Sequence, residues 1–142
     1  YEDVPQFSGT EKPFSHYLEA AGFSVDAYAE NTIVDPDLYD VIIYGLSQIQ
    51  QFGCGEYFIK WGELHKGMLR SMQRFWYEIP TIMISFYNPF HLFDAPNVKT
   101  YINAYHASDT VYRVLVEKLL GKQPFLGTSP INPFIGNFRH QD

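Results

Sequence analysis

The chain has 142 residues, of which 46% are apolar and 18% charged, and its formal net charge is −6. Aromatic residues are abundant (12 Phe, 11 Tyr and 2 Trp), a composition that excludes an intrinsically disordered chain. The 10 Lys and Arg residues are scattered, so neither a nucleic acid nor an anionic membrane surface is an expected partner. The length suits one domain or part of a larger protein.

No apolar run approaches the roughly 20 residues that span a bilayer, so no membrane segment is expected. The single cysteine, Cys54, cannot form a disulfide within the chain. The first residues lack the features of a signal peptide, and we expect the natural protein to begin upstream of Tyr1. Neither the bacterial cytoplasm nor export is favoured.

The first predicted element is a helix from a Thr10 cap to about Ala21, with Pro13 in its first turn and Gly22 closing it. Residues 23–29 then alternate between apolar and polar, which predicts a strand with one exposed face near a sheet edge. The β-branched run at 41–46 predicts a strand buried on both faces.

Apolar residues recur at three- and four-residue steps from Leu64 to Ile79, which predicts an amphipathic helix that Pro80 ends. Strands are predicted at 81–86 and 100–105. A last helix is capped by Ser108 or Asp109 and closed by Gly121, with its inward residues predicted to be Val111, Val114, Leu115 and Leu119.

Helices that alternate with doubly buried strands are typical of an α/β fold, a three-layer α/β/α sandwich with a mostly parallel, flavodoxin-like sheet. Its first strand would lie upstream of Tyr1 or within residues 1–7. The expected organisation is a sandwich domain over 1–122 and a Pro/Gly-rich irregular tail over 123–142 that packs on it.

The segment after the 81–86 strand is the most promising for function, because open α/β sheets bind ligands beyond the carboxyl ends of their strands. It mixes aromatic and polar side chains suited to sugars: Asn88, Phe90, His91 and Asp94. Arg74 and Trp76 join this set of candidates. The alternative for all six is packing against another domain or the tail.

Other motifs fail on spacing. Gly53-Cys54-Gly55 lacks the third glycine of a dinucleotide loop, since position 58 is Phe. The five histidines show no metal-ligand spacing, so no metal or other cofactor is predicted.

Several motifs in fixed order resemble the C-terminal domain of bacterial glycoside hydrolase family 3 enzymes, especially the β-N-acetylhexosaminidase (β-N-acetylglucosaminidase) branch. They are RSMQRFW (70–76), IPTIMISF (79–86), KTYINAY (99–105), LLGK (119–122) and PFLGTSP (124–130). The resemblance implies an N-terminal (β/α)8-type barrel that carries the sugar site and a nucleophilic Asp, followed by an α/β sandwich.

The same resemblance implies that the acid/base of the hexosaminidase branch is a His on the missing barrel. In the β-glucosidase branch the second domain donates a Glu, for which Glu56 and Glu63 are the candidates here. The chain is then expected to be an accessory domain that braces the barrel, borders the carbohydrate groove and hydrolyses nothing alone. The alternatives are a freestanding flavodoxin-like module that binds a small molecule or sugar, and a pure interaction domain.

Overall fold

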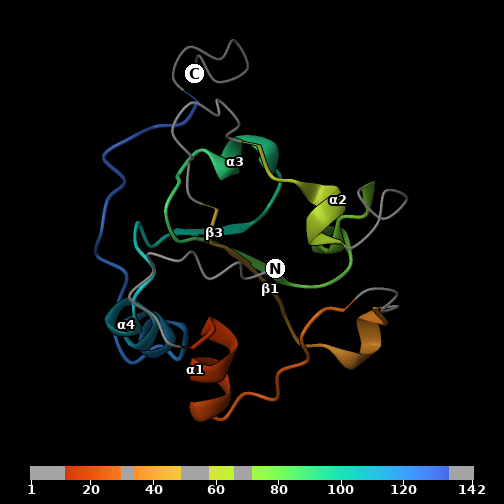
Figure 1. The fold of residues 1–142 in the computed structure, drawn as a ribbon, viewed down its shortest axis with the longest axis horizontal. Coiled ribbons are helices and arrows are strands. Elements are labelled where there is room, and N and C mark those ends of the chain that lie inside the picture. Colours follow the sequence, from red (N-terminus) through yellow and green to blue (C-terminus); the bar gives the residue numbers. More distant parts are fainter. Residues whose placement is uncertain (1–11, 30–33, 49–57, 66–71, 135–142) are drawn as a thin grey trace.

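A three-stranded parallel sheet forms the centre of the molecule in the computed structural model, which describes residues 12–29, 34–48, 58–65 and 72–134. The strands are β1 (Ile42–Leu46), β2 (Thr81–Ser85) and β3 (Thr100–Asn103), in the spatial order β1-β2-β3 (Figure 1). Tyr44, Met83 and Tyr101 stand side by side across it. The three strands predicted at 41–46, 81–86 and 100–105 are therefore confirmed.

Helices cover both faces of the sheet (Figure 1). The helices α1 (Phe14–Ala20) and α4 (Asp109–Leu119) lie on one face. The short elements α2 (Trp61–Leu64), η3 (Phe75–Tyr77) and α3 (His91–Asp94) belong to the other, and η1 (Pro36–Leu38) precedes β1. The predicted α/β class with a parallel sheet is confirmed. Residues 1–7, one of the two places expected for a first strand, lie outside the described residues, so this expectation stays a prediction.

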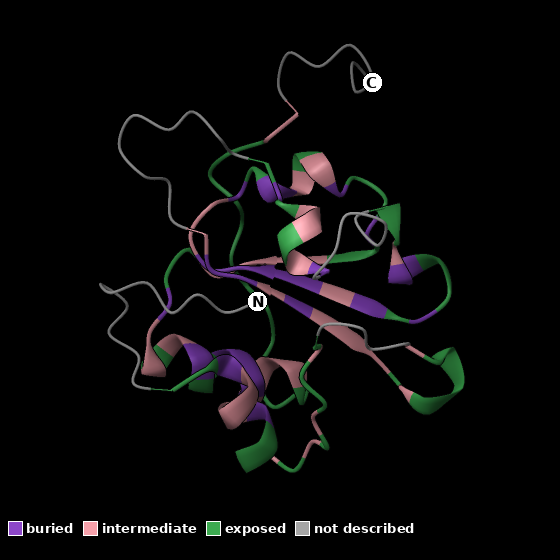
Figure 2. Ribbon diagram, turned by 45° about the vertical axis from the view of Figure 1, so that its right-hand side comes forward, coloured by how far each residue is buried: buried purple, intermediate pink, exposed green. Residues whose placement is uncertain are grey.

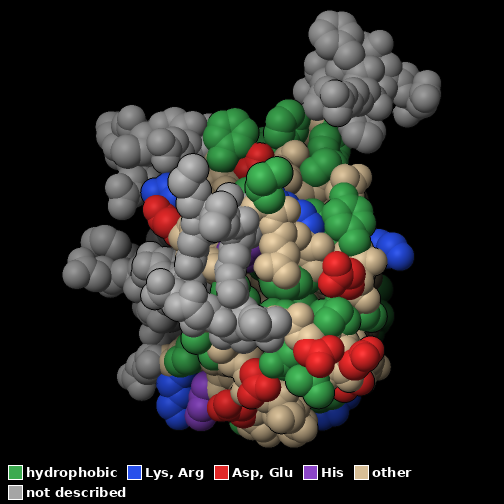
Figure 3. Space-filling model, turned by 90° about the vertical axis from the view of Figure 1, so that its right-hand side faces the viewer, with side chains coloured by type: hydrophobic (Ala, Val, Ile, Leu, Met, Phe, Trp, Pro, Cys, Tyr) green, Lys and Arg blue, Asp and Glu red, His purple; other side chains and the backbone are tan. Residues whose placement is uncertain are grey.

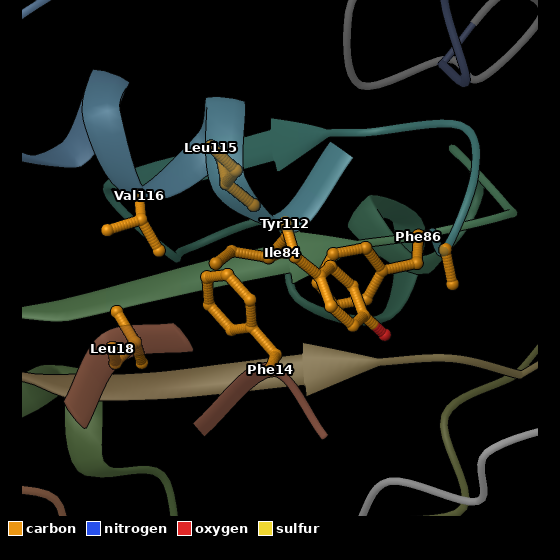
Figure 4. Packing of buried hydrophobic residues seen from close by; sticks show 8 residues of the cluster. Phe14, Leu18, Ile84, Phe86, Tyr112, Leu115 and Val116 are labelled. Carbon is orange, nitrogen blue, oxygen red and sulfur yellow. The ribbon is translucent and has the colours of Figure 1, made fainter. Parts of the chain in front are cut away.

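Each face of the sheet has its own core, because successive side chains of a strand point to opposite sides. On the first face Ile84 and Phe86 pack between α1 and α4. Figure 4 shows Phe14 and Leu18 of α1 meeting Tyr112, Leu115 and Val116 of α4 there. The second core gathers Tyr44, Leu46 and Met83 with Phe75, Trp76, Ala95 and Val98. Figure 2 shows how burial concentrates on the strands and the inner sides of these helices.

The strand predicted for residues 23–29 is wrong, since none of them lies in a strand. The alternation that suggested it is real: Phe23 and Val25 are partly buried against the first core, whereas Ser24 and Asp26 are exposed. The pattern reflects an irregular segment that packs one side on the core. No described strand pairs with it.

The long helix predicted from Leu64 to Ile79 is also wrong over the residues described. α2 ends at Leu64, and Arg74 has the extended angles φ −137° and ψ 105°. Met72, an expected inward residue, is 85% exposed. Phe75 and Ile79 are buried, so their spacing serves core packing without a continuous helix.

The ends and faces of the two long helices correct further details. α1 begins after Pro13, which is the N-cap residue and not part of the first turn, and Thr10 lies outside the described residues. Ser108 caps α4 as predicted, since its side chain accepts a hydrogen bond from the Val111 amide. The inward face of α4 is rotated from the prediction, because Tyr112 inserts its ring between Phe14 and Phe86 and Val114 turns outward.

Beyond Gly121 the described residues 123–134 form no helix or strand, as the prolines predict. Phe125, Leu126 and Ile131 in this segment are largely exposed. The division of the chain at residue 122 stays a prediction.

Gly22 and Gly121 are expected to be the costly glycines to replace, because their φ angles of 95° and 73° favour a residue without Cβ. Gly22→Ala should lower the free energy of unfolding by about 1 kcal/mol. Gly45→Ala in β1 is the matched control. Its Cβ would meet the Phe86 ring at an ordinary 3.6 Å, so it should cost much less in chemical denaturation. Equal losses for the two variants would contradict this assignment.

Candidate functional site

The loop that follows β2 is tied together from inside by Ser85. The Ser85 Oγ lies 2.9 Å from His91 Nδ1 and donates a hydrogen bond to the carbonyl of Asn88. The Asn88 amide donates back to the same hydroxyl at 3.3 Å. A strand residue thus fixes both the turn at Asn88 and the start of α3.

His91 is buried, with only 1% of its surface exposed, and its role in the structure is internal. Burial lowers the pKa of its imidazole from 6.5 to about 4, because the charged form would lose its hydration. The ring is therefore neutral near pH 7 and holds the loop through Ser85. A direct contact of His91 with a sugar would need the loop to open.

The outer side of the loop presents aromatic rings. The Asn88 Oδ1 accepts a hydrogen bond from the Phe90 amide at 2.8 Å, which forms a tight turn. The Tyr101 hydroxyl donates to the carbonyls of Asn88 and Pro89, and burial raises the pKa of Tyr101 to about 12, so it keeps its proton. This bracing leaves Phe90 and Phe93 partly exposed to solvent.

Asp94 connects α3 to the segment that precedes α2. Its Oδ2 accepts a hydrogen bond from the Ile59 amide at 2.5 Å. Burial raises the pKa of the carboxyl, while the Ile59 bond and the positive charge of Arg74 act in the opposite direction. The carboxylate therefore serves first as an anchor between two connections on the same face of the sheet.

Arg74 lies over an aromatic floor. Its guanidinium carbon is 3.8 Å from the centre of the Trp61 ring and 5.7 Å from that of Trp76. The two indole rings are 5.7 Å apart in an edge arrangement. Burial lowers the pKa of Arg74, and the Tyr44 hydroxyl and Asp94 oppose that shift. Such a cation over a ring stabilises by about 1 kcal/mol.

The structure thus brings Arg74, Trp76 and Asp94 together beside α2, and places Asn88, Phe90 and His91 in the adjoining loop. Glu63, on α2, has an exposed side chain in ion-pair contact with Lys60 at 3.7 Å. Glu56 lies outside the described residues, so the acid/base assignment stays a prediction for both glutamates. Figure 3 shows the side of the molecule that carries α2, with acidic side chains gathered below and apolar ones above.

Sequence reasoning missed Trp61, Tyr44 and His65 in this part of the molecule. The Tyr44 hydroxyl lies 3.1 Å from His65 Nε2, and Tyr28 donates a hydrogen bond to the His65 carbonyl at 3.3 Å. A tyrosine inside an apolar strand was the available signal, because its buried hydroxyl needs a polar partner.

The anchor at Asp94 gives a testable expectation. Asp94→Ala should lower the free energy of unfolding by about 1.5 kcal/mol, since the Ile59 amide loses a charged acceptor. Asp94→Asn keeps an acceptor oxygen and should lose less than half of that in urea unfolding. If Asp94→Asn loses more than half of what Asp94→Ala loses, the negative charge beside Arg74, and not the hydrogen bond to the Ile59 amide, provides the stabilisation.

No group of three His, Cys, Asp or Glu side chains within the described parts of the chain is placed to hold a metal ion. None of the helices described is both long enough and apolar enough to cross a membrane.

No protein-family model matches the chain, but it is similar to carbohydrate-active enzymes. A curated relative, the "Beta-N-acetylglucosaminidase/beta-glucosidase" of Cellulomonas fimi, is 41% identical over 80 residues. That match covers 56% of this chain and 14% of the relative.

Two solved structures are similar over nearly the whole chain. The "Beta-glucoside phosphorylase BglX" is 33% identical with a TM-score of 0.73, covering 88% of this chain and 23% of that one. The same enzyme bound to 2FGlc gives 34% identity and a TM-score of 0.72. The chain thus spans less than a quarter of the length of these relatives. The resemblance of this chain to one domain of glycoside hydrolase family 3 enzymes, predicted from its motifs, is confirmed.

Proposed function

We propose that this chain is the accessory α/β domain of a larger family 3 enzyme that cleaves β-linked glucosides or N-acetylglucosaminides. The observation that carries the proposal is the pair of coverages: 88% of this chain matches only 23% of a β-glucoside phosphorylase. The curated relative, whose name combines N-acetylglucosaminidase and glucosidase, supports the same substrate class. The domain braces the catalytic part and borders its carbohydrate groove.

The chemistry of the described residues supports an accessory role. Double-displacement cleavage needs a nucleophile and an acid/base on opposite sides of the bond, about 5 Å apart when both are carboxylates. Here Asp94 is held by a backbone amide and Glu63 is paired with Lys60. His91 is enclosed in the core. These contacts suit structural roles, and the nucleophile would come from the N-terminal barrel.

The exposed ring of Phe90 supports the part of the proposal that concerns the groove. It stands just past the carboxyl end of β2, where open α/β sheets place ligands. Flat aromatic faces stack against the C–H faces of sugars, and the polar groups at Asn88 lie beside them.

The activity test compares this chain with the full product of its source gene. The chain alone should release nothing from an aryl β-N-acetylglucosaminide or an aryl β-glucoside, whereas the full product should turn over at least one. Each assay is run with and without inorganic phosphate, because one relative is a phosphorylase. Heat-sensitive turnover by the chain alone would overturn the accessory role, and an inactive full product would overturn the glycosidase assignment.

A freestanding sugar-binding module is the second candidate, favoured by the exposure of Phe90 at the end of β2. It would show changes in amide resonances with N-acetylglucosamine that Phe90→Ala abolishes. Substituting His91 would be a poor test, because its buried ring holds the loop. No response at millimolar sugar would remove this candidate.

A further inference from the structure

The segment that follows α4, residues 123–134, is here called the arm. It contains no charged residue, in a chain whose net charge is −6. It forms neither helix nor strand. Its apolar side chains are unusually exposed, with Leu126 at 83% and Phe125 at 53%. Exposed apolar side chains in such a run mark surfaces that another surface covers.

The arm is nevertheless held in place at its start. The side-chain Nε2 of Gln123 donates a hydrogen bond to the Glu117 carboxylate at 2.6 Å, and the Lys118 ammonium donates one to the Pro124 carbonyl at 2.5 Å. The same ammonium lies 5.4 Å from the centre of the Phe125 ring. The last turn of α4 therefore fixes the direction in which the arm departs.

Two further contacts fix its far end. Ser129 Oγ lies 2.8 Å from the Tyr105 hydroxyl, just after β3, and accepts a hydrogen bond from the Ile131 amide. The Phe134 ring stacks on Phe93 of α3 with centres 6.2 Å apart. The arm thus returns from the end of α4 to the carboxyl side of the sheet, along the margin of the domain (Figure 1).

We propose that the arm, together with Phe93 and Tyr105, is the surface by which this domain docks on the larger, catalytic part of the same polypeptide. This inference rests on the proposed function. The polar contacts of the arm hold its backbone in shape, while the side chains of Phe125, Leu126 and Ile131 face outward. The relatives indicate what covers the arm, namely the rest of the polypeptide, because more than three quarters of their length lies outside the part that matches this domain.

A second copy of this chain is the less favoured occupant. Two chains of net charge −6 repel each other, whereas the arm itself brings no charge that would offset this repulsion. The apolar, uncharged arm suits a partner that is covalently joined to the domain. The effective concentration of such a partner at the arm is high, so docking needs no charged contacts.

The test is hydrogen exchange measured by mass spectrometry over peptides within 124–131, in the full gene product and in the 142-residue chain. Docking should slow exchange of these amides by at least about tenfold in the full product. Leu126→Glu should return the exchange to the rate of the chain alone. The matched control is Leu38→Glu in η1, a leucine that is 73% exposed and lies outside the arm, and it should leave the protection intact.

Unprotected arm amides in an active full product would overturn the docking proposal and leave the glycosidase assignment standing. Protected amides in an inactive full product would overturn the glycosidase assignment and leave the docking proposal standing. Protection that appears in the chain alone and vanishes on dilution would assign the arm to a second copy and overturn the proposal. The wild-type comparison decides even if Leu126→Glu fails to fold.

Discussion

Replacing Phe86 with alanine is expected to lower the free energy of unfolding by about 4 kcal/mol. The side chain is 0% exposed and stands directly after β2, on the face that α1 and α4 cover. Its ring centre is 4.9 Å from that of Tyr112 and 5.6 Å from that of Phe14, both in edge arrangements (Figure 4). Alanine would leave a cavity at the point where both helices meet the sheet.

The measurement is urea unfolding followed by circular dichroism at neutral pH. Phe58→Ala is the matched control, because Phe58 is largely exposed and should change stability by no more than about 0.5 kcal/mol. A loss below about 1 kcal/mol for Phe86→Ala would mean that the first core can collapse around the missing ring.

The strands could be predicted because their sequence leaves little choice. Residues 81–85 carry β-branched and apolar side chains on both sides, which suits a central strand between two cores. Ser108 and Gly121 likewise mark the ends of α4 by local chemistry, a side-chain cap and a positive φ. Local signals of this kind need no knowledge of distant contacts.

Between Leu64 and Ile79 the sequence could not predict the structure, because the decisive contacts are distant. His65 ends α2 while its ring reaches Tyr44 of β1, and Arg74 takes an extended backbone with its guanidinium over Trp61. Apolar spacing of three and four residues survives in either arrangement. Tertiary contacts here override helix propensity.

The position of the loop after β2 could be predicted from the sequence, but the contacts of its side chains could not. The loop follows the carboxyl end of β2, and Phe90 is exposed there. Burial of His91 could not be predicted from the sequence, because its ring is held inside the loop by a contact with the Ser85 hydroxyl at the end of β2. Asp94 likewise contacts Ile59, a residue far away in the chain.

Acidification should destabilise the domain through His91. Its folded pKa, about 4, lies below the ordinary 6.5, so between these values the unfolded chain binds more protons than the folded one. The stability that the neutral ring contributes is fully present above pH 6.5 and is lost as the pH falls through 4. The difference between the two pKa values corresponds to about 3 kcal/mol.

His91→Asn isolates this contribution, because its amide nitrogen can stand in for Nδ1 toward Ser85 but carries no charge at any pH. Urea unfolding at pH 7 and pH 4.5 should show a drop in stability for the wild type that exceeds the drop for His91→Asn by about 2 kcal/mol or more. His106→Asn, at an exposed position, is the matched control for the exchange itself and should change the stability at pH 7 by no more than about 0.5 kcal/mol. Equal drops in the wild type and His91→Asn would mean that the folded protein does not lower the pKa of His91, and that the ring keeps its hydration in the loop after β2.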